Sequence, residues 1–235
     1  MPSPNHLIIV CCHGVWTGGP SNGFSEDEWL IADFQRGETA TFIEHIKAGL
    51  RCLAEDYDNA MLAFSGYANI ASSNNFFNII PSTKNPSSKV LIEDRALDSY
   101  HNVLFSLTLF YTRFHTWPAH LTVVSHAFKE PRLVNGHCTA IGFPLERTAF
   151  VGIDPPGMTN EENVDGMKGV GQAVDDWTRD PHGRGEVLAG KRRRRNPWGV
   201  WQGIFKEKGG DKGGLVTEGE GEAETLVDGA PRPWK

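Results

Sequence analysis

The sequence lacks cysteine pairs and metal-binding motifs. Its four cysteines, Cys11, Cys12, Cys52 and Cys138, include no Cys-x-x-Cys pair, so they form neither a disulfide framework nor a cysteine-based zinc motif. The nine histidines include no His-Glu-x-x-His motif, and we therefore predict that no metal is bound. Unpaired cysteines are typical of a reducing compartment, which predicts a cytoplasmic location.

The sequence also lacks long apolar runs and an excess of basic residues. The run from Leu7 to Cys12 is too short for a signal peptide, and no stretch approaches the roughly 20 apolar residues of a membrane span. The 23 basic and 29 acidic residues give a net charge of -6, whereas nucleic-acid binding needs clustered positive charge. We expect neither a membrane nor a nucleic-acid partner, and the sequence identifies no protein partner.

Apolar residues make up 39% of the chain, enough to bury a core. Short apolar runs, typical of strands covered on both faces, lie at 7–12, 61–64, 121–124 and 148–151. Apolar residues at three- and four-residue spacing predict helices over 42–53 and 103–110, and a short helix follows over 128–141. This alternation predicts a three-layer α/β sandwich with a mainly parallel sheet.

The 235 residues divide unevenly between this pattern and a glycine-rich end. We predict one α/β domain over 1–205, with its core at about 5–153 and a C-terminal extension over 154–205. Of the 26 glycines, 12 lie in 183–235. That composition predicts an irregular, flexible tail over 206–235.

Three of the predicted strands end in polar or glycine turns. These are His13-Gly14, Ser65-Gly66 and Ser125-His126. The carboxyl ends of parallel strands share one edge of the sheet, and ligands bind there where the strand order reverses. Helices that begin at this edge point free N–H groups at it, which favours an anionic or polar ligand. We therefore predict that these three segments converge on one site.

The predicted roles at this edge follow from the residue types. His13 and His126 are candidate catalytic groups that transfer a proton, and the alternative is a structural histidine in a turn. Lys129 and Arg132 suit a phosphate or carboxylate if they share a helix face, and the alternative is a solvated surface. The candidate ligand-binding residues are Gly14, Ser65, Gly66, Asn102, Ser125, Lys129 and Arg132.

Several motifs, in this order and spacing, are found together in a known family. They are 6–10 leading into His13-Gly14, then Phe64-Ser65-Gly66, 98–102, 124–129 with Arg132, and 195–199. With them the sequence resembles the family called domain of unknown function 218, with YdcF-like, SanA-like and ElyC-like members, and most closely its fungal branch. The resemblance implies a Rossmann-like fold. It also implies S-adenosylmethionine as a candidate cofactor, because a bacterial relative binds it.

One segment departs from the family pattern. Fungal relatives continue the second strand as Ser-Gly-Gly-Gln-Thr-Arg and then Ser-Glu-Ala, whereas this chain has Tyr67 in place of the second glycine and lacks the later elements. A Cβ at this position would hinder close backbone approach if the turn needs a positive φ.

The sequence therefore leaves three functions open. The leading one is a domain that binds a small anionic or nucleotide-type ligand. The second is a hydrolase of a phosphate or ester that uses Ser65, although no Gly-x-Ser-x-Gly elbow surrounds it. The third is a non-catalytic interaction protein with an eroded site. Whether the chain is an enzyme stays open.

Overall fold

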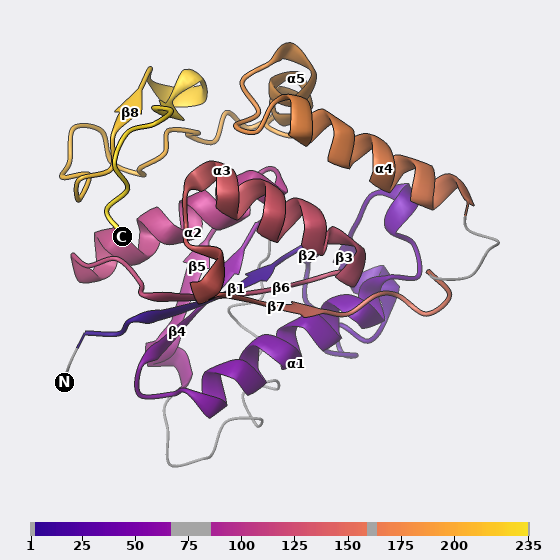
Figure 1. Ribbon diagram of the computed structural model, residues 1–235. Coiled ribbons are helices and arrows are strands. Elements are labelled where there is room, and N and C mark those ends of the chain that lie inside the picture. The colour runs from indigo at the N-terminus through magenta and orange to yellow at the C-terminus, as the bar shows by residue number, and fades with distance from the viewer. Residues whose placement is uncertain (1–2, 67–85, 159–163, 235) are drawn as a thin grey trace.

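The central feature of the fold is a five-stranded parallel sheet (Figure 1). The computed structural model describes residues 3–66, 86–158 and 164–234. Its strands are β1 (His6–Cys11), β4 (Ala60–Ser65), β5 (Val90–Glu93), β6 (His120–Ser125) and β7 (Thr148–Gly152). They lie in the order β5-β4-β1-β6-β7 and all pair in parallel. This confirms the predicted α/β sandwich and its Rossmann-like arrangement. The segment that begins at Tyr67 lies outside the described residues.

The middle strands are apolar throughout because helices cover both faces of the sheet. All residues of β4 are buried, and so are the residues of β1 after His6. On one face, α1 (Thr39–Glu55) packs its stripe of Phe42, Ile46 and Leu50 against alternate side chains of β1. Strands covered on both faces read as continuous apolar runs, which explains why the sequence located them.

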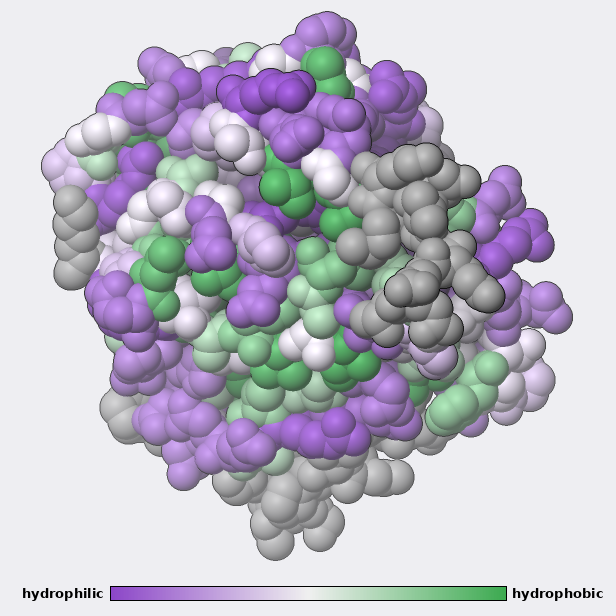
Figure 2. Space-filling view, turned by 45° about the vertical axis from the view of Figure 1, so that its right-hand side comes forward, coloured by the Kyte–Doolittle hydropathy of each residue, from purple (hydrophilic) through white to green (hydrophobic). Residues whose placement is uncertain are grey.

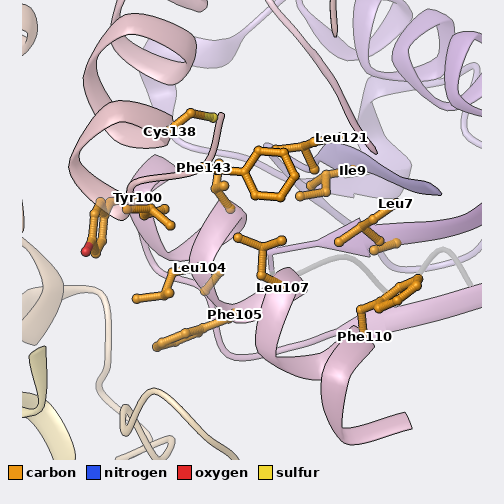
Figure 3. Packing of buried hydrophobic residues seen from close by; sticks show 14 of the residues in the cluster. Leu7, Ile9, Tyr100, Leu104, Phe105, Leu107, Phe110, Leu121, Cys138 and Phe143 are labelled. Carbon is orange, nitrogen blue, oxygen red and sulfur yellow. The ribbon is translucent and has the colours of Figure 1, made fainter. Parts of the chain in front are cut away.

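The other face of the sheet carries α2 (Ser99–Phe114), the π-helical segment η7 (Pro131–Cys138) and α3 (Thr139–Ile141). Figure 3 shows Leu7 and Ile9 of β1 meeting Leu107 of α2 and Phe143 in this core. The helix α2 begins at Asp98, whose carboxylate accepts a hydrogen bond from the backbone N–H of His101 at 2.9 Å. These contacts fix the start of α2 beside the carboxyl edge of the sheet.

The C-terminal part of the chain lies beyond α2 and α3 (Figure 1). It contains α4 (Val164–Arg179), α5 (Glu186–Arg194), β8 (Thr217–Glu218) and β9 (Thr225–Leu226). The sequence predicts a flexible tail over 206–235. Up to residue 234 this segment has little regular structure, as predicted, but Leu215, Leu226 and Trp234 are buried in the same core as α2. These apolar contacts tie the segment to the domain, and glycine content gave no sign of them.

A loop connects β1 to α1 at the carboxyl edge and contains β2 (Val15–Trp16) and β3 (Trp29–Leu30). The carboxylate of Glu28 accepts hydrogen bonds from the backbone N–H groups of Ser21 and Gly23 at 2.7 and 2.6 Å. Although burial favours the neutral acid, these bonds hold the pKa of Glu28 at about 2. The loop is thus organised around one buried carboxylate.

Among the residues that the structure describes, no helix has the length and apolar character of a membrane span.

Candidate functional site

The strand order reverses between β1 and β6, because β4 and β5 lie on one side of β1 while β6 and β7 lie on the other. At this point His13 and His126 lie with ring centroids 4.5 Å apart. The hydroxyl oxygen of Ser125 is 3.4 Å from Nε2 of His13. The structure therefore brings together the segments that follow β1 and β6. Figure 2 turns this side of the molecule forward and shows a band of apolar residues between hydrophilic margins.

A third histidine, which the sequence analysis did not single out, completes the group. His45 lies on α1, with its ring centroid 4.9 Å from that of His126 and 5.7 Å from that of His13. Its Nε2 is 2.8 Å from the carbonyl oxygen of Ile153. The signal in the sequence was its position beside Phe42 and Ile46 on the buried stripe of the helix, where a polar side chain is uncommon.

The pKa values of all three imidazoles are lowered, so the rings are neutral at pH 7. Burial lowers the pKa of His126 to about 2 and that of His45 to about 4. Burial and then the charge of Lys129 lower the pKa of His13 well below its usual value. His126 is only 1% exposed, and neither of its ring nitrogens has a hydrogen-bond partner. Nε2 of His126 lies 3.7 Å from a carboxylate oxygen of Glu38.

Lys129 and Arg132 follow β6 on two different helical segments, η6 (Ala127–Lys129) and η7. The Lys129 ammonium is 3.4 Å from Nδ1 of His13. Burial and then the charge of Arg132 lower the pKa of Lys129 to about 7. Nε of Arg132 is buried and has no hydrogen-bond partner. π-Helical turns of this kind are rare and are often found at functional sites.

No carboxylate in the described part of the chain forms an ion pair with Lys129 or Arg132. Glu38 and Asp98 act on these cations from farther away, and Asp98 is already paired with Arg192 at 3.1 Å. Arg195, directly after α5, adds a third positive charge that acts on both Lys129 and Arg132. The sequence analysis placed Arg195 among the family motifs but gave it no role at the site.

Ser65 and Asn102 lie on the α2 side of the sheet. The Ser65 hydroxyl donates toward a carboxylate oxygen of Glu93 at 3.1 Å and lies 3.3 Å from Oδ1 of Asn102. Ser65 is fully buried, and in the described residues no hydrogen bond joins it to His13 or His126. These contacts show a serine whose hydroxyl is held by Glu93 rather than by an imidazole base.

The two candidate glycines lie where space is restricted. Gly66 has φ +105°, and a Cβ there would lie 3.1 Å from the carbonyl oxygen of Cys12 and 3.5 Å from Oδ1 of Asn102. A Cβ on Gly14 would lie 2.8 Å from the side chain of Ile31. Both glycines therefore allow neighbouring segments to approach closely at the carboxyl edge.

A wider hollow of about 620 Å³ lies elsewhere, at the start of β6. Three of the polar side chains that line it already have partners. The Tyr111 hydroxyl donates to Asp211 at 2.5 Å, Nε1 of Trp117 donates to the carbonyl of Gly213 at 2.8 Å, and Arg147 donates to the carbonyl of Trp234. A hollow with satisfied polar groups supports a ligand site less well than the group at the carboxyl edge.

Comparison with known proteins finds one relative of similar extent. The chain is 24% identical over 293 aligned positions to an uncharacterised protein of Saccharomyces cerevisiae, with 97% of this chain and 96% of the yeast protein covered. Because 293 exceeds the 235 residues of this chain, the alignment contains gaps. No protein-family model and no solved structure matches the chain.

Proposed function

We propose that this protein binds a small anionic or nucleotide-type ligand at the carboxyl edge of its sheet, with S-adenosylmethionine as one candidate. Two observations carry the proposal. Neither Lys129 nor Arg132 forms an ion pair in the described chain, and the charge of Arg132 acts on Lys129. Lys129 also contacts His13, whose ring lies beside that of His126. We also infer membership of the domain of unknown function 218 family from the motifs, and a cytoplasmic location.

Physical chemistry favours an anion at this position. Removing a cation from water is costly unless an opposite charge compensates it. Here other cations add to that cost instead: Arg132 and Arg195 both lower the pKa of Lys129, and Arg195 also lowers the pKa of Arg132. A phosphate or carboxylate would neutralise this field, and the free Nε of Arg132 would donate to it. Binding at a strand-order reversal agrees with the position of ligands in open parallel sheets.

His13 and His126 are the candidate groups for proton transfer if the bound ligand reacts. Both rings are neutral, so each has a nitrogen that accepts a proton and one that donates. If the ligand is S-adenosylmethionine, methyl transfer needs mainly positioning, because the sulfonium already activates the methyl group. Ser65 lacks an imidazole partner, which gives the hydrolase alternative less support than ligand binding.

A thermal-shift series tests the proposal. Inorganic phosphate, adenosine nucleotides and S-adenosylmethionine are added separately to the metal-free protein. A ligand at 100 times its Kd stabilises the folded state by about 2.7 kcal/mol. We expect at least one of these ligands to raise the melting temperature. This rise should be lost in the double variant Lys129→Met with Arg132→Met. The half-exposed Lys47, which pairs with Glu44 on α1, provides the matched control Lys47→Met.

Two outcomes would count against anion binding. If none of the three ligands shifts the melting temperature, the non-catalytic interaction protein becomes the better interpretation. If the ligand raises the melting temperature of the double variant as much as that of the control Lys47→Met, the anion binds somewhere other than at Lys129 and Arg132.

A further inference from the structure

We propose that His13, His45 and His126 form a binding site for one divalent transition-metal ion, of which Zn²⁺ is the best match. Each histidine offers one ring nitrogen, and these three atoms all lie within 4.8 Å of one another. The histidines come from the end of β1, from α1 and from the end of β6, so no local sequence motif announces the site. The inference is separate from anion binding, because it needs neither Lys129 nor Arg132.

The ring nitrogens have few competing partners. Nδ1 of His45 and both ring nitrogens of His126 are buried without a hydrogen bond, and both residues are 1% exposed. A buried polar atom that lacks a partner destabilises the folded state, because it has lost its hydrogen bonds to water. Coordination of a metal ion would satisfy Nδ1 of His45 and one ring nitrogen of His126.

The orientation of His45 matches that of a metal ligand. Nε2 of His45 donates to the carbonyl oxygen of Ile153 at 2.8 Å, which leaves Nδ1 as the unprotonated nitrogen of the neutral ring. Metal-bound histidines usually donate their second N–H to a carbonyl or carboxylate in this way. The neutral state of the three rings also suits coordination, which requires an unprotonated nitrogen.

A small cavity of about 10 Å³ lies beside two of the three rings, between His13, His45, Trp29 and Phe42. Its volume is close to that of one water molecule, so it is far too small for a large ligand. Ring contacts of Phe42 with His13 and Trp29 hold α1 against the end of β1.

Binding requires a small movement that the structure permits. Zn–N bonds of 2.0–2.1 Å place tetrahedral nitrogen ligands roughly 3.3 Å apart. The ring nitrogens lie within 4.8 Å of one another, so the rings must close by up to about 1.5 Å. His13 is the ring best able to move. It is half-buried, and its contacts to Ser125 and Lys129 are both 3.4 Å long, beyond the usual range for a strong hydrogen bond.

The charges around the site are mixed. Lys129 contacts His13 and opposes a second cation, whereas Glu38 lies 3.7 Å from His126 and favours one. Three imidazole ligands suit Zn²⁺ among the common divalent ions. Three protein ligands leave a fourth position open, as in catalytic and not structural zinc sites. An anion held by Lys129 and Arg132 is the natural candidate for that position.

Cobalt titration tests the metal site directly. The chelator-treated protein is titrated with Co²⁺, followed by its visible absorption, and the bound Co²⁺ is then displaced with Zn²⁺. We expect one equivalent to bind, with the intense absorption of a four-coordinate ion. The single variants His13→Gln, His45→Gln and His126→Gln should each weaken Co²⁺ binding. Loss of a residue that only hydrogen-bonds to a metal ligand typically lowers the affinity by about 10–100-fold, so loss of a ligand itself should cost at least as much. His13→Gln is the variant that keeps the buried helix packing intact.

Matched controls separate the metal site from general histidine binding and from anion binding. His101→Gln removes a buried histidine that stacks on Phe105, and His120→Gln removes an exposed one. Both should bind one equivalent of Co²⁺ with the affinity of the unchanged protein. Lys129→Met removes a cation that opposes the metal, so it should not weaken Co²⁺ binding. The proposal is overturned if fewer than one equivalent binds, or if His13→Gln binds Co²⁺ with unchanged affinity. If phosphate still raises the melting temperature when a chelator is present, the proposed anion binding stands even without a metal site.

Discussion

His13 and His126 face each other at 4.5 Å between ring centroids, although β4, β5 and α2 separate them along the chain. Their contact is a consequence of topology, since β1 and β6 are neighbours in the sheet with Val10 opposite Val124. Each histidine leaves its strand at the same edge. The contact thus places two neutral imidazoles in the crevice where the strand order reverses.

The backbone at Gly66 should resist a side chain. The substitution Gly66→Ala forces a Cβ to within 3.1 Å of the carbonyl of Cys12 at φ +105°, and such strained positions cost about 1–3 kcal/mol. We expect a loss of that size in the free energy of unfolding, measured by urea denaturation. The control Gly210→Ala lies in open space and should change stability little. Equal effects of the two substitutions would contradict the close approach of β4 to β1.

The buried pair of Asp98 and Arg192 should matter for the start of α2. Asp98→Ala removes both the cap on His101 N–H and the 3.1 Å ion pair, and it leaves a buried guanidinium uncompensated. Losing one partner of a buried pair costs about 3–5 kcal/mol. The exposed pair of Asp33 and Arg36 provides the control, because Asp33→Ala should cost about 0–1 kcal/mol. Calorimetry that finds equal losses for the two aspartates would refute this assignment.

The buried histidines on the α2 side should make stability depend on pH. Burial lowers the pKa of His101 to about 4, below the 6.5 of an unfolded histidine. Between pH 6.5 and about 4 the unfolded chain therefore takes up a proton that the folded chain does not. Stability should fall as the pH falls through this window, by about 1.4 kcal/mol per pH unit for one such group. His101→Gln should reduce this slope in urea denaturation, and a slope identical to that of the unchanged protein would contradict it.

The C-terminal segment should be anchored by Trp234. This side chain is 3% exposed, and its Nε1 donates to the carbonyl oxygen of Gly142 at 2.8 Å. Trp234→Ala should destabilise the segment by about 3–5 kcal/mol, seen as faster amide hydrogen exchange over 206–234. Trp198 is 74% exposed, and Trp198→Ala should leave exchange in that segment unchanged. Rapid exchange over 206–234 in the unchanged protein would instead support the flexible tail that the composition predicts.

The sequence predicted those parts of the fold that depend on local pattern. Strands covered on both faces are apolar throughout, so β1, β4, β6 and β7 were visible as runs. The short strand β5 was missed because its four residues follow a stretch rich in Asn, Ser and Pro.

The basic residues 191–194 form the last turn of α5, where Arg192 is buried against Asp98. A run of basic residues does not show which of its members will find a distant carboxylate.

The candidate site was visible in part for the same reason. His13, Ser125 and His126 follow apolar runs, and parallel topology brings such ends together. His45 was missed because its one signal, a polar residue on the buried stripe of a helix, does not show which distant side chains it will meet. The group of three histidines exists only through contacts between β1, α1 and β6, and no spacing rule connects positions 13, 45 and 126.

Anion binding at Lys129 and Arg132 is tested most directly by locating a heavy anion on the protein. Crystals exposed to tungstate, a phosphate analogue with strong anomalous scattering, would show where it binds. We predict a peak in contact with both the Lys129 ammonium and the Arg132 guanidinium, beside His13. An occupied tungstate position elsewhere, with none between these two cations, would contradict the proposed site.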